Sequence, residues 1–488
     1  MLVSLGGRLR AMTVILTLIF AVAEVLGVLS AVHAVFTVRT SQGTIAWVVG
    51  LVAFPWLGLP LYWMFGSRRF DAYSQAMKRK LADHQSRIHR KRAEMARFEV
   101  NRADLATPRA ADLAALAGEE FLRENRLELL IDGEATFGAM LAEIARAKRC
   151  VFVQFYIMRE DGLGLRLLEA LAAKAAEGVE VCFLIDSFGS AGMRPAILQK
   201  WRDRGVRMAT FCAYSRWRDR WRLNFRNHRK NVIVDGRVGF VGGHNVGDEY
   251  LGLSAKFGRW RDTHVRVEGP SAMQLQMVFS ADWFFATGEV LEDRWQKEEP
   301  AAAGEPAESA LVLASGPSDD HERCTLFFLH VISMAERRLW IASPYFVPDE
   351  GILQALQLAA IRGVEVRILQ PLRPDEPLVW LASCALLTGL KHPNIHVHRF
   401  TGGFLHQKVL LVDEDFAAVG SANFDNRSFR LNFEVTLAVS DRRFAGEVAG
   451  MLSRDFAESL EIGPDEYESR PIYFKAAAQA ARLLAPIL

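Results

Sequence analysis

The same order of sequence blocks occurs twice in this chain. The first copy reads CVFVQFYIMREDGLGLRLLEALAAKAAEGVEVCFLIDS from Cys150, and the second reads RLWIASPYFVPDEGILQALQLAAIRGVEVRILQP from Arg338. Each copy has a β-branched and aromatic strand, a helix with apolar residues at spacings of three and four, and a Gly-Val-Glu-Val turn into another strand. The continuous apolar strands predict a largely parallel sheet with helices on both faces. We therefore expect an α/β fold of two pseudo-symmetric α-β-α sandwich domains.

A second pair of blocks follows in the same order. NHRKNVIVDGRVGFVGGHNVGDEY begins at Asn227, and LHQKVLLVDEDFAAVGSANFDNRS begins at Leu405. A single His-x-Lys carries no information, but five matched positions in two copies favour a functional site. The matched residues are His228, Lys230, Asp235, Gly242 and Asn245 in the first copy and His406, Lys408, Asp413, Gly420 and Asn423 in the second.

The spacing of these residues suits phosphoryl transfer. Side chains at positions i and i+2 of a strand point to the same face, so each histidine projects together with its lysine. Two copies meeting edge to edge would surround one cleft with two imidazoles, two ammonium groups and two amides. Lysine and asparagine donors stabilise phosphoryl oxygens, while one imidazole attacks phosphorus and the other protonates the departing alkoxide. Metal binding is the main chemical alternative, but a lysine beside each histidine would repel a divalent cation.

With these motifs, the chain resembles the phospholipase D superfamily and, within it, the bacterial cardiolipin synthases, over nearly its whole length. The hallmark His-x-Lys-x4-Asp followed by Gly-Gly/Ser-x-Asn is present twice. Further matching segments are PWLGLPLYWMFGSRRF, GDEYLG, WRDTHVRVEGP, PYFVPDE and NFDNRSFRLNFEV. The resemblance implies two phospholipase D-like domains that condense two phosphatidylglycerol molecules into cardiolipin and glycerol through a phosphohistidine. It implies no cofactor and no metal in the chemical step.

The resemblance also implies roles for individual residues. His228 and His406 would be the nucleophile and the acid/base, with His228 favoured as the nucleophile and the choice left open. Substrate phosphate would be held by Lys230, Lys408, Asn245 and Asn423. The motif places Asp235 and Asp413 with the catalytic set, but their odd offset from the histidines turns them away from that strand face, so we expect them to support the fold.

We expect two further features at the same site. Asp262 in WRDTHVRV and Glu434 in NFEVTLAV occupy matching places, and we expect each carboxylate to orient an imidazole through its other ring nitrogen. The two turns differ, because the first has Gly243 where the second has Ser421. Only the second turn therefore offers the substrate a hydroxyl donor.

Two apolar segments precede the repeated blocks. Residues 11–36 and 44–65 are each long enough to cross a bilayer as a helix, which predicts a two-helix transmembrane hairpin; the alternative is a cleaved signal peptide. Basic residues flank the pair, and only Arg39 lies between the segments. Both ends should therefore lie in the cytoplasm of a bacterium, with the protein in its inner membrane as a multi-pass protein. Five scattered cysteines without a CxxC pair agree with a reducing compartment.

The domain organisation follows from shifts in composition. We expect the transmembrane hairpin at 1–69, a charged helical connector at 70–125, a first phospholipase D-like domain at 126–291 and a second at 311–470. The Pro/Ala/Glu-rich segment 292–310 reads as a linker. Residues 471–488 read as a short apolar helix.

A basic and aromatic stretch, YSRWRDRWRLNFRNHRK from Tyr214, leads into the first histidine. On a helix it suits an anionic membrane interface, with a solvated face or a nucleic-acid patch as alternatives. The interface residues would be Arg216, Trp217, Arg218, Trp221 and Arg222. A net charge of +2 gives no field that favours nucleic acid, so the expected partners are phosphatidylglycerol and anionic lipid, with a homo-oligomer left open. A phospholipase and a membrane-tethered nuclease are the alternative functions.

Overall fold

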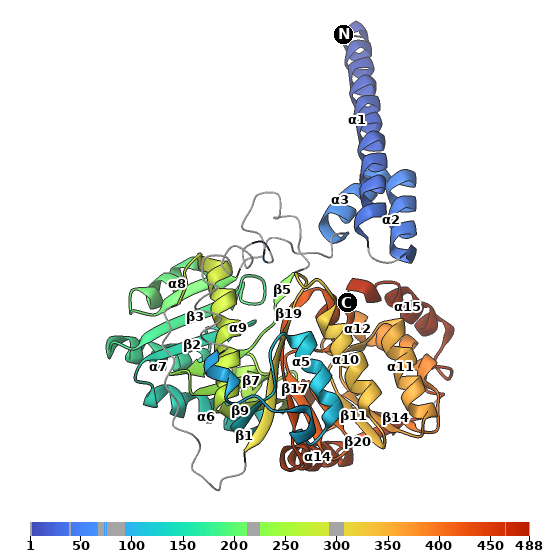
Figure 1. The fold of residues 1–488 in the computed structure, drawn as a ribbon. Helices are drawn as coiled ribbons and strands as arrows, with labels where there is room; N and C mark the ends of the chain where they lie inside the picture. The colour runs from blue at the N-terminus through green and yellow to red at the C-terminus, as the bar shows by residue number, and fades with distance from the viewer. Residues whose placement is uncertain are drawn as a thin grey trace. The chain divides into compact units, whose positions relative to one another are not determined.

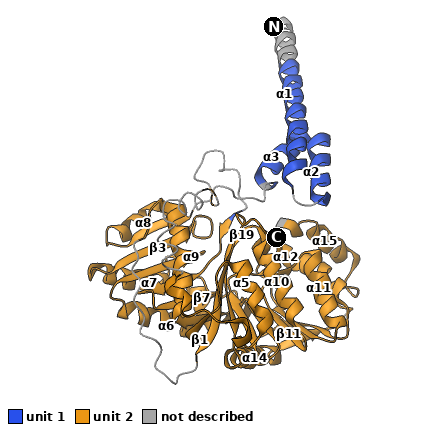
Figure 2. Ribbon diagram, viewed as in Figure 1, with its two compact units in different colours: residues 1–71, 213–225 blue, residues 72–212, 226–488 orange. Residues whose placement is uncertain are grey.

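The computed structural model describes residues 2–38, 41–66, 73, 75, 93–211, 225–291, 307–463 and 465–487. The chain divides into two compact units, one of residues 1–71 with 213–225 and one of residues 72–212 with 226–488 (Figure 2). Each unit is considered by itself below.

The smaller unit contains three apolar helices, α1 (Leu2–Thr37), α2 (Ser41–Ala53) and α3 (Pro55–Phe65). Within α1, the 26 residues Met12–Thr37 are long and apolar enough to cross a membrane, as predicted. The second predicted span is wrong as a single helix, because residues 44–65 are divided between α2 and α3. Proline has no N–H to donate and disfavours helical geometry in the residue before it. Phe54, with φ −138° and ψ 60°, accordingly separates α2 from Pro55 at the start of α3.

The larger unit is built on one sheet of sixteen described strands (Figure 1). Its first half has the order β1-β9-β7-β6-β2-β3-β4, and its second half has the order β10-β19-β17-β16-β11-β13-β14-β20. The sixteenth strand, β5, pairs with β19 beside this path. The halves join where β1 and β10 pair antiparallel. Counted outward from this junction, strands at the same position in the two halves carry the duplicated blocks, for example β6 and β16. The predicted pseudo-symmetry is therefore present in the topology.

The elements of the two halves follow one another in nearly the same order. Those of the first half are β1 (Leu122–Ile131), α6 (Asp132–Arg146), β2 (Cys150–Phe155), α7 (Gly162–Ala176), β3 (Glu180–Asp186), α8 (Pro195–Arg202), β4 (Arg207–Phe211), β5 (Arg226–Asn227), β6 (Asn231–Val234), β7 (Val238–Gly242), β8 (Trp260–Arg261), β9 (Thr263–Glu268) and α9 (Pro270–Thr287), preceded by α5 (Asp112–Ala117). Those of the second half are β10 (Glu308–Ser315), α10 (Arg323–Met334), β11 (Arg338–Ala342), β12 (Phe346–Val347), α11 (Glu350–Ile361), β13 (Glu365–Pro371), α12 (Pro377–Leu387), β14 (Ile395–Phe400), β15 (Phe404–Leu405), β16 (Val409–Val412), β17 (Phe416–Gly420), β18 (Phe424–Asp425), α13 (Asn426–Arg430), β19 (Asn432–Ser440), α14 (Arg442–Ala457), β20 (Ser459–Ile462) and α15 (Ile472–Arg482). Short 3-10 turns lie at Arg102–Asp104, Pro108–Ala111, Asp248–Leu251, Thr388–Leu390 and Ala485–Ile487.

The predicted β-α-β units form as expected, and matching residues fix their ends. Asp161 and Asp349 cap α7 and α11 by accepting hydrogen bonds from the N–H groups of Gly164 and Ile352. Gly178 and Gly363 follow these helices with φ of +85° and +95°, which only glycine adopts without strain.

Helices cover both faces of each half of the sheet. In the first half, α6, α7 and α8 pack on the face that carries Val151 and Val153, while Phe152 points to the other face and stacks on Phe279 of α9 at 5.1 Å. In the second half, α10, α11 and α12 cover one face, and α14 brings Phe456 against Trp340 on the other. The predicted α-β-α layering is therefore confirmed, and α15 packs beside α12.

The prediction of a largely parallel sheet is wrong. Along the path of the sheet, parallel pairing is limited to β2-β3-β4 and β11-β13-β14, and beside this path β5 pairs parallel with β19. The strands that carry the duplicated motifs pair antiparallel as the hairpins β6-β7 and β16-β17. Strand direction was misread because all these strands are buried on both faces. Burial on two faces produces a continuous apolar run whichever way the neighbouring strand runs.

Candidate active site

Residues of both halves line a single cavity of about 460 Å³ in the larger unit. His228 and Asn245 come from the first half, and His406 and Asn423 come from the second. A larger hollow of about 670 Å³ near β14 and β20 contains none of the duplicated motif residues. The two copies thus contribute their histidines and asparagines to the same space.

Backbone pairing between the halves brings the two histidines to this cavity. β5, directly before His228, pairs with β19 of the second half, and the His228 N–H donates to the Phe433 carbonyl at 2.9 Å. β15, directly before His406, pairs with β8 of the first half, and the His406 N–H donates to the Arg261 carbonyl at 2.8 Å. Each histidine is therefore held by a strand of the opposite half.

The carboxylate partners of the histidines also come from the opposite halves. Nδ1 of His228 lies 3.0 Å from both carboxylate oxygens of Glu434, and Nδ1 of His406 lies 2.6 Å from Oδ2 of Asp262. All four side chains are buried. With Nδ1–H donated to a carboxylate, Nε2 is left as the nucleophilic nitrogen.

Burial and charge set the protonation states of these pairs. Burial lowers the pKa of His228 to about 4 and that of His406 to about 3, the latter with a further contribution from Lys408. Burial alone would raise the pKa values of Asp262 and Glu434, but the facing histidines and lysines lower both. The protein by itself therefore holds neutral imidazoles beside ionised carboxylates.

The motif lysines lie beside the histidines, as their spacing predicts. Nζ of Lys230 donates to the His228 carbonyl at 2.5 Å. Nζ of Lys408 donates to the His406 carbonyl and lies 3.0 Å from Nε2 of that ring. Burial lowers the pKa of Lys230 well below its usual value and that of Lys408 to about 8. Most Lys408 side chains remain charged near neutral pH and can neutralise an incoming phosphate.

The two asparagines line the cavity with different partners. Oδ1 of Asn245 accepts from the Ile157 N–H at 3.1 Å, and its Nδ2 donates to the Tyr250 hydroxyl at 3.1 Å. Oδ1 of Asn423 is buried and has no hydrogen-bond partner within the described ranges. An unpaired buried amide oxygen is costly, and because it can only accept, it suits a hydroxyl group of a substrate.

The turns before these asparagines position the carboxylates. The Ser421 hydroxyl donates to Oε2 of Glu434 at 2.5 Å, so in this structure it binds the carboxylate, whereas the sequence suggested a donor for the substrate. At the equivalent Gly243, an added Cβ would overlap Oδ1 of Asp262. Serine with glutamate in one half and glycine with aspartate in the other are thus two ways of filling the same space.

The motif aspartates bind backbone away from the cavity. Asp235 accepts hydrogen bonds from the N–H groups of residues 148, 149 and 150, and Asp413 accepts from those of residues 336, 337 and 338. Both adopt left-handed backbone conformations, with φ of +54° and +50°. Each joins the start of a central strand to the motif hairpin, in line with the expected support of the fold.

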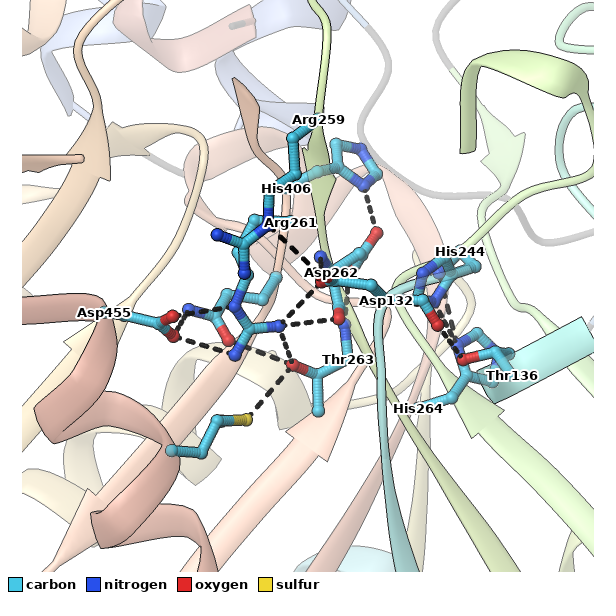
Figure 3. A network of polar contacts seen from close by, with 12 residues as sticks. Asp132, Thr136, His244, Arg259, Arg261, Asp262, Thr263, His264, His406 and Asp455 are labelled. Carbon is cyan, nitrogen blue, oxygen red and sulfur yellow. Dashed lines mark hydrogen bonds and ion pairs between the residues drawn. The ribbon is translucent and has the colours of Figure 1, made fainter. Parts of the chain in front are cut away.

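Two buried aspartates that the sequence analysis missed, Asp282 and Asp455, bind residues that flank the two histidines or pair with their segments. Asp282 accepts from Arg229 and Asn227, on either side of His228, at 2.6 and 2.8 Å. Asp455 binds Arg261 through two hydrogen bonds of 2.7 and 2.8 Å and also accepts from Gln407 (Figure 3). The signal available was that each aspartate lies in the last long helix of its half, α9 or α14.

Several other cavity residues also lacked a sequence signal. Tyr156 meets the His228 ring edge to face, and Trp260 lies 5.3 Å from the His406 ring. Arg226 and Arg427 add positive charge to the lining, and burial raises the pKa of Asp425 to about 6. The interface residues Arg216, Trp217, Arg218, Trp221 and Arg222 lie outside the described residues, so that prediction stays open.

Comparison with known proteins places this geometry in a family. A model described as "Cardiolipin synthase, PLD-like domain" matches residues 140–283 and 328–456, and one described as "Phospholipase_D-nuclease N-terminal" matches residues 25–67. The chain is 46% identical over 494 residues to cardiolipin synthase A of Pseudomonas aeruginosa strain LESB58, covering 99% of this chain and 98% of that protein. It is 44% identical to cardiolipin synthase A of Pseudomonas putida strain GB-1, covering 95% and 97%.

Solved structures agree on the fold. The crystal structure of phosphatidylserine synthase from Haemophilus influenzae Rd KW20 matches with a TM-score of 0.59 at 15% identity, covering 74% of this chain and 95% of that one. At this identity the match indicates a shared fold alone.

Proposed function

The chain belongs to the phospholipase D-like family of bacterial cardiolipin synthases, and on that premise we propose how its paired site joins two phosphatidylglycerol molecules into cardiolipin with release of glycerol. It is a phosphatidyltransferase. The observation that carries the proposal is the single cavity lined by the histidine and asparagine of both copies.

In the first half-reaction, Nε2 of one histidine, which we take to be His228, attacks the phosphorus of phosphatidylglycerol. The P–O bond to the head-group glycerol breaks, and a phosphatidyl-histidine forms. His406 gives its proton to the departing glycerol oxygen. Burial disfavours a charged imidazole, but the negative charge of the bound phosphodiester raises the pKa of the His406 ring and allows it to carry the proton.

In the second half-reaction, the head-group glycerol of another phosphatidylglycerol enters. His406, now neutral, takes the proton of its hydroxyl, and the oxygen attacks phosphorus and releases His228. Lys230, Lys408, Asn245 and Asn423 stabilise the negative charge on the phosphoryl oxygens in both steps. Glu434 and Asp262 keep Nδ1 protonated, so Nε2 of each ring faces the reaction.

The N-terminal unit associates the protein with the membrane, where this substrate resides. We propose that the catalytic unit faces the cytoplasm of the bacterial inner membrane. The proposal is supported by the basic residues after α3 and by Cys150, Cys182, Cys324 and Cys384, which are buried and unpaired.

The test uses the purified full-length protein in detergent with phosphatidylglycerol. Cardiolipin and free glycerol in equal amounts are expected, and both should disappear with His228→Ala and with His406→Ala. Phosphatidic acid in place of cardiolipin would instead identify a phospholipase, in which water takes the phosphatidyl group.

A further inference from the structure

The three apolar helices are arranged differently from two membrane-spanning helices in a hairpin. α2 runs back beside α1 from the Thr37 end, and α3 then returns toward that same end (Figure 1). Leu51, close to the carboxyl end of α2, and Pro55, the first residue of α3, both pack against Gly27, ten positions before Thr37. An added Cβ at Gly27 would overlap the Leu51 carbonyl. The connection between α2 and α3 therefore lies beside the middle of α1.

The far end of α3 is fixed to the last turns of α1. The Tyr62 hydroxyl lies 2.6 Å from Nδ1 of His33 and 3.1 Å from the Thr37 hydroxyl, and the indole N–H of Trp63 donates to the Ser30 hydroxyl at 3.2 Å. In a hairpin of two full spans, residues 62–65 would instead lie near the amino end of α1. These contacts are incompatible with that arrangement.

Helix lengths lead to the same conclusion. At 1.5 Å per residue, α2 is about 20 Å long and α3 about 17 Å, both short of the roughly 30 Å of hydrocarbon that a spanning helix must cross. Met12–Thr37 of α1 exceeds that thickness. Of the described helices in this unit, α1 alone is long enough to span.

The outer surface of α2 and α3 suits lipid acyl chains. Residues 41–65 contain no charged side chain, and Ile45, Val49, Trp56 and Leu57 are all more than half exposed. A break in a helix is tolerated at membrane depth where its backbone groups are hydrogen-bonded within the protein. Phe54 is exposed, but its N–H donates to the Gly50 carbonyl at 3.0 Å and its carbonyl accepts from the Gly58 N–H at 2.7 Å. Gly58 allows the two helices to approach closely, because an added Cβ there would overlap the Gly50 carbonyl.

We infer that α2 and α3 form a re-entrant hairpin that enters the bilayer and leaves it on the side where α1 ends. The segment after α3, which reads SRRFDAYSQAMKRKLADHQSRIHRKRAE from Ser67, is too charged to cross a bilayer. The amino end of α1 and the catalytic unit therefore lie on opposite sides of the membrane, contrary to the sequence prediction that both lie in the cytoplasm. With the catalytic unit in the cytoplasm, the amino end is outside.

Single cysteines test this topology in the full-length protein. Ser41→Cys lies at the exposed first residue of α2, and Ser469→Cys lies on the exposed surface of the catalytic unit as the matched reference. A membrane-impermeant maleimide is applied to spheroplasts and to inverted vesicles, and labelling of the unsubstituted chain is subtracted. Epitope tags at the two ends of the chain, probed with added protease, provide an independent readout.

The re-entrant hairpin predicts that the two cysteines are labelled from the same side and that the two tags are cleaved from opposite sides. Two full spans predict the reverse for both readouts. Labelling of Ser41→Cys from the side opposite Ser469→Cys, or from neither side, would overturn the inference. Neither readout uses lipid turnover, so the result does not depend on the proposed reaction.

Discussion

His406 and Asp262 lie 144 positions apart in the chain and in opposite halves of the sheet, yet Nδ1 of the histidine is 2.6 Å from Oδ2 of the aspartate. His228 and Glu434 are related in the same way across 206 positions. Each half therefore supplies a histidine and the acid that orients the histidine of the other half. Neither half contains a complete orienting pair.

Because each acid orients the histidine of the other half, replacing either acid by its amide should have a large effect on the reaction rate. Glu434→Gln and Asp262→Asn should each lower kcat for cardiolipin formation by about 10²- to 10⁴-fold, because the imidazole loses the carboxylate that fixes its tautomer. Histidine ¹⁵N spectra should show the tautomer change at His228 for the first variant and at His406 for the second.

The surface pair of His396 and Glu461, with Nδ1 and Oε1 2.7 Å apart, supplies a matched control. Glu461→Gln should leave kcat unchanged, because that pair is exposed and lines no part of the cavity. Turnover at the unsubstituted rate in both Glu434→Gln and Asp262→Asn would contradict the assigned role.

Alanine at the two equivalent turn positions should have unequal effects. Ser421→Ala removes one hydrogen bond to Glu434, which at about 1.5 kcal/mol corresponds to roughly a tenfold loss of kcat. Gly243→Ala places a Cβ where Asp262 lies and should reduce kcat well beyond that. Steady-state rates, with thermal unfolding as a check on folding, decide the matter, and equal losses would contradict this reading.

The pKa shifts of His228 and Lys408 predict two limits in the pH profile of kcat at saturating phosphatidylglycerol, because the bound phosphodiester then keeps on His406 the proton that the mechanism needs. The attacking imidazole must be neutral, so activity falls as the pH drops through about 4, the pKa of His228. Lys408 must be charged, so activity falls as the pH rises through about 8. In Lys408→Arg, the loss of activity at alkaline pH should shift to higher pH, even if the maximal rate is lower. An alkaline limb that stays in place would assign it to another group.

The Arg261–Asp455 pair should stabilise the junction of the two halves. Asp455→Ala removes the two-bond partner of the buried Arg261 and leaves that charge with its longer contact to Asp132 at 3.2 Å, which we expect to cost about 3 kcal/mol. Arg259→Ala, two positions away, breaks only the exposed contacts to Asp132 and Glu458 and should cost less than about 1 kcal/mol. Thermal unfolding of the two variants in the same detergent makes the comparison, and equal small shifts would contradict the junction role.

The sequence was sufficient to predict the duplicated α/β layers and the residues of the motif, because duplication makes five weak signals recur together. Strand periodicity predicted that Lys230 lies beside His228, and it does, but both residues lie between β5 and β6 and the lysine donates to the His228 carbonyl. Matching positions were also enough to select Asp262 and Glu434 as acids. Their crossing between the halves could not be predicted, because it depends on β5 and β15 pairing with strands far away in the sequence.

Other features were missed for equally physical reasons. The motif strands are buried on both faces, so their apolar runs did not report antiparallel pairing. In the segment 44–65, hydropathy gave the apolar length but not its division at Pro55. The packing of Leu51 and Pro55 against Gly27 is a tertiary contact, and the local sequence carries no signal for it. The domain limits at 126–291 and 311–470 remain predictions.

The account as a whole requires that the two halves form one site with one nucleophile. Purified protein should be mixed with ³²P-labelled phosphatidylglycerol and the reaction quenched within milliseconds to seconds. The protein is then digested, and the label bound to each histidine-containing peptide is measured. We predict at most one phosphatidyl group per chain, on the peptide of a single motif histidine, and none in the variant that lacks it. Labelling of both His228 and His406 peptides to a total of two groups per chain would contradict the account.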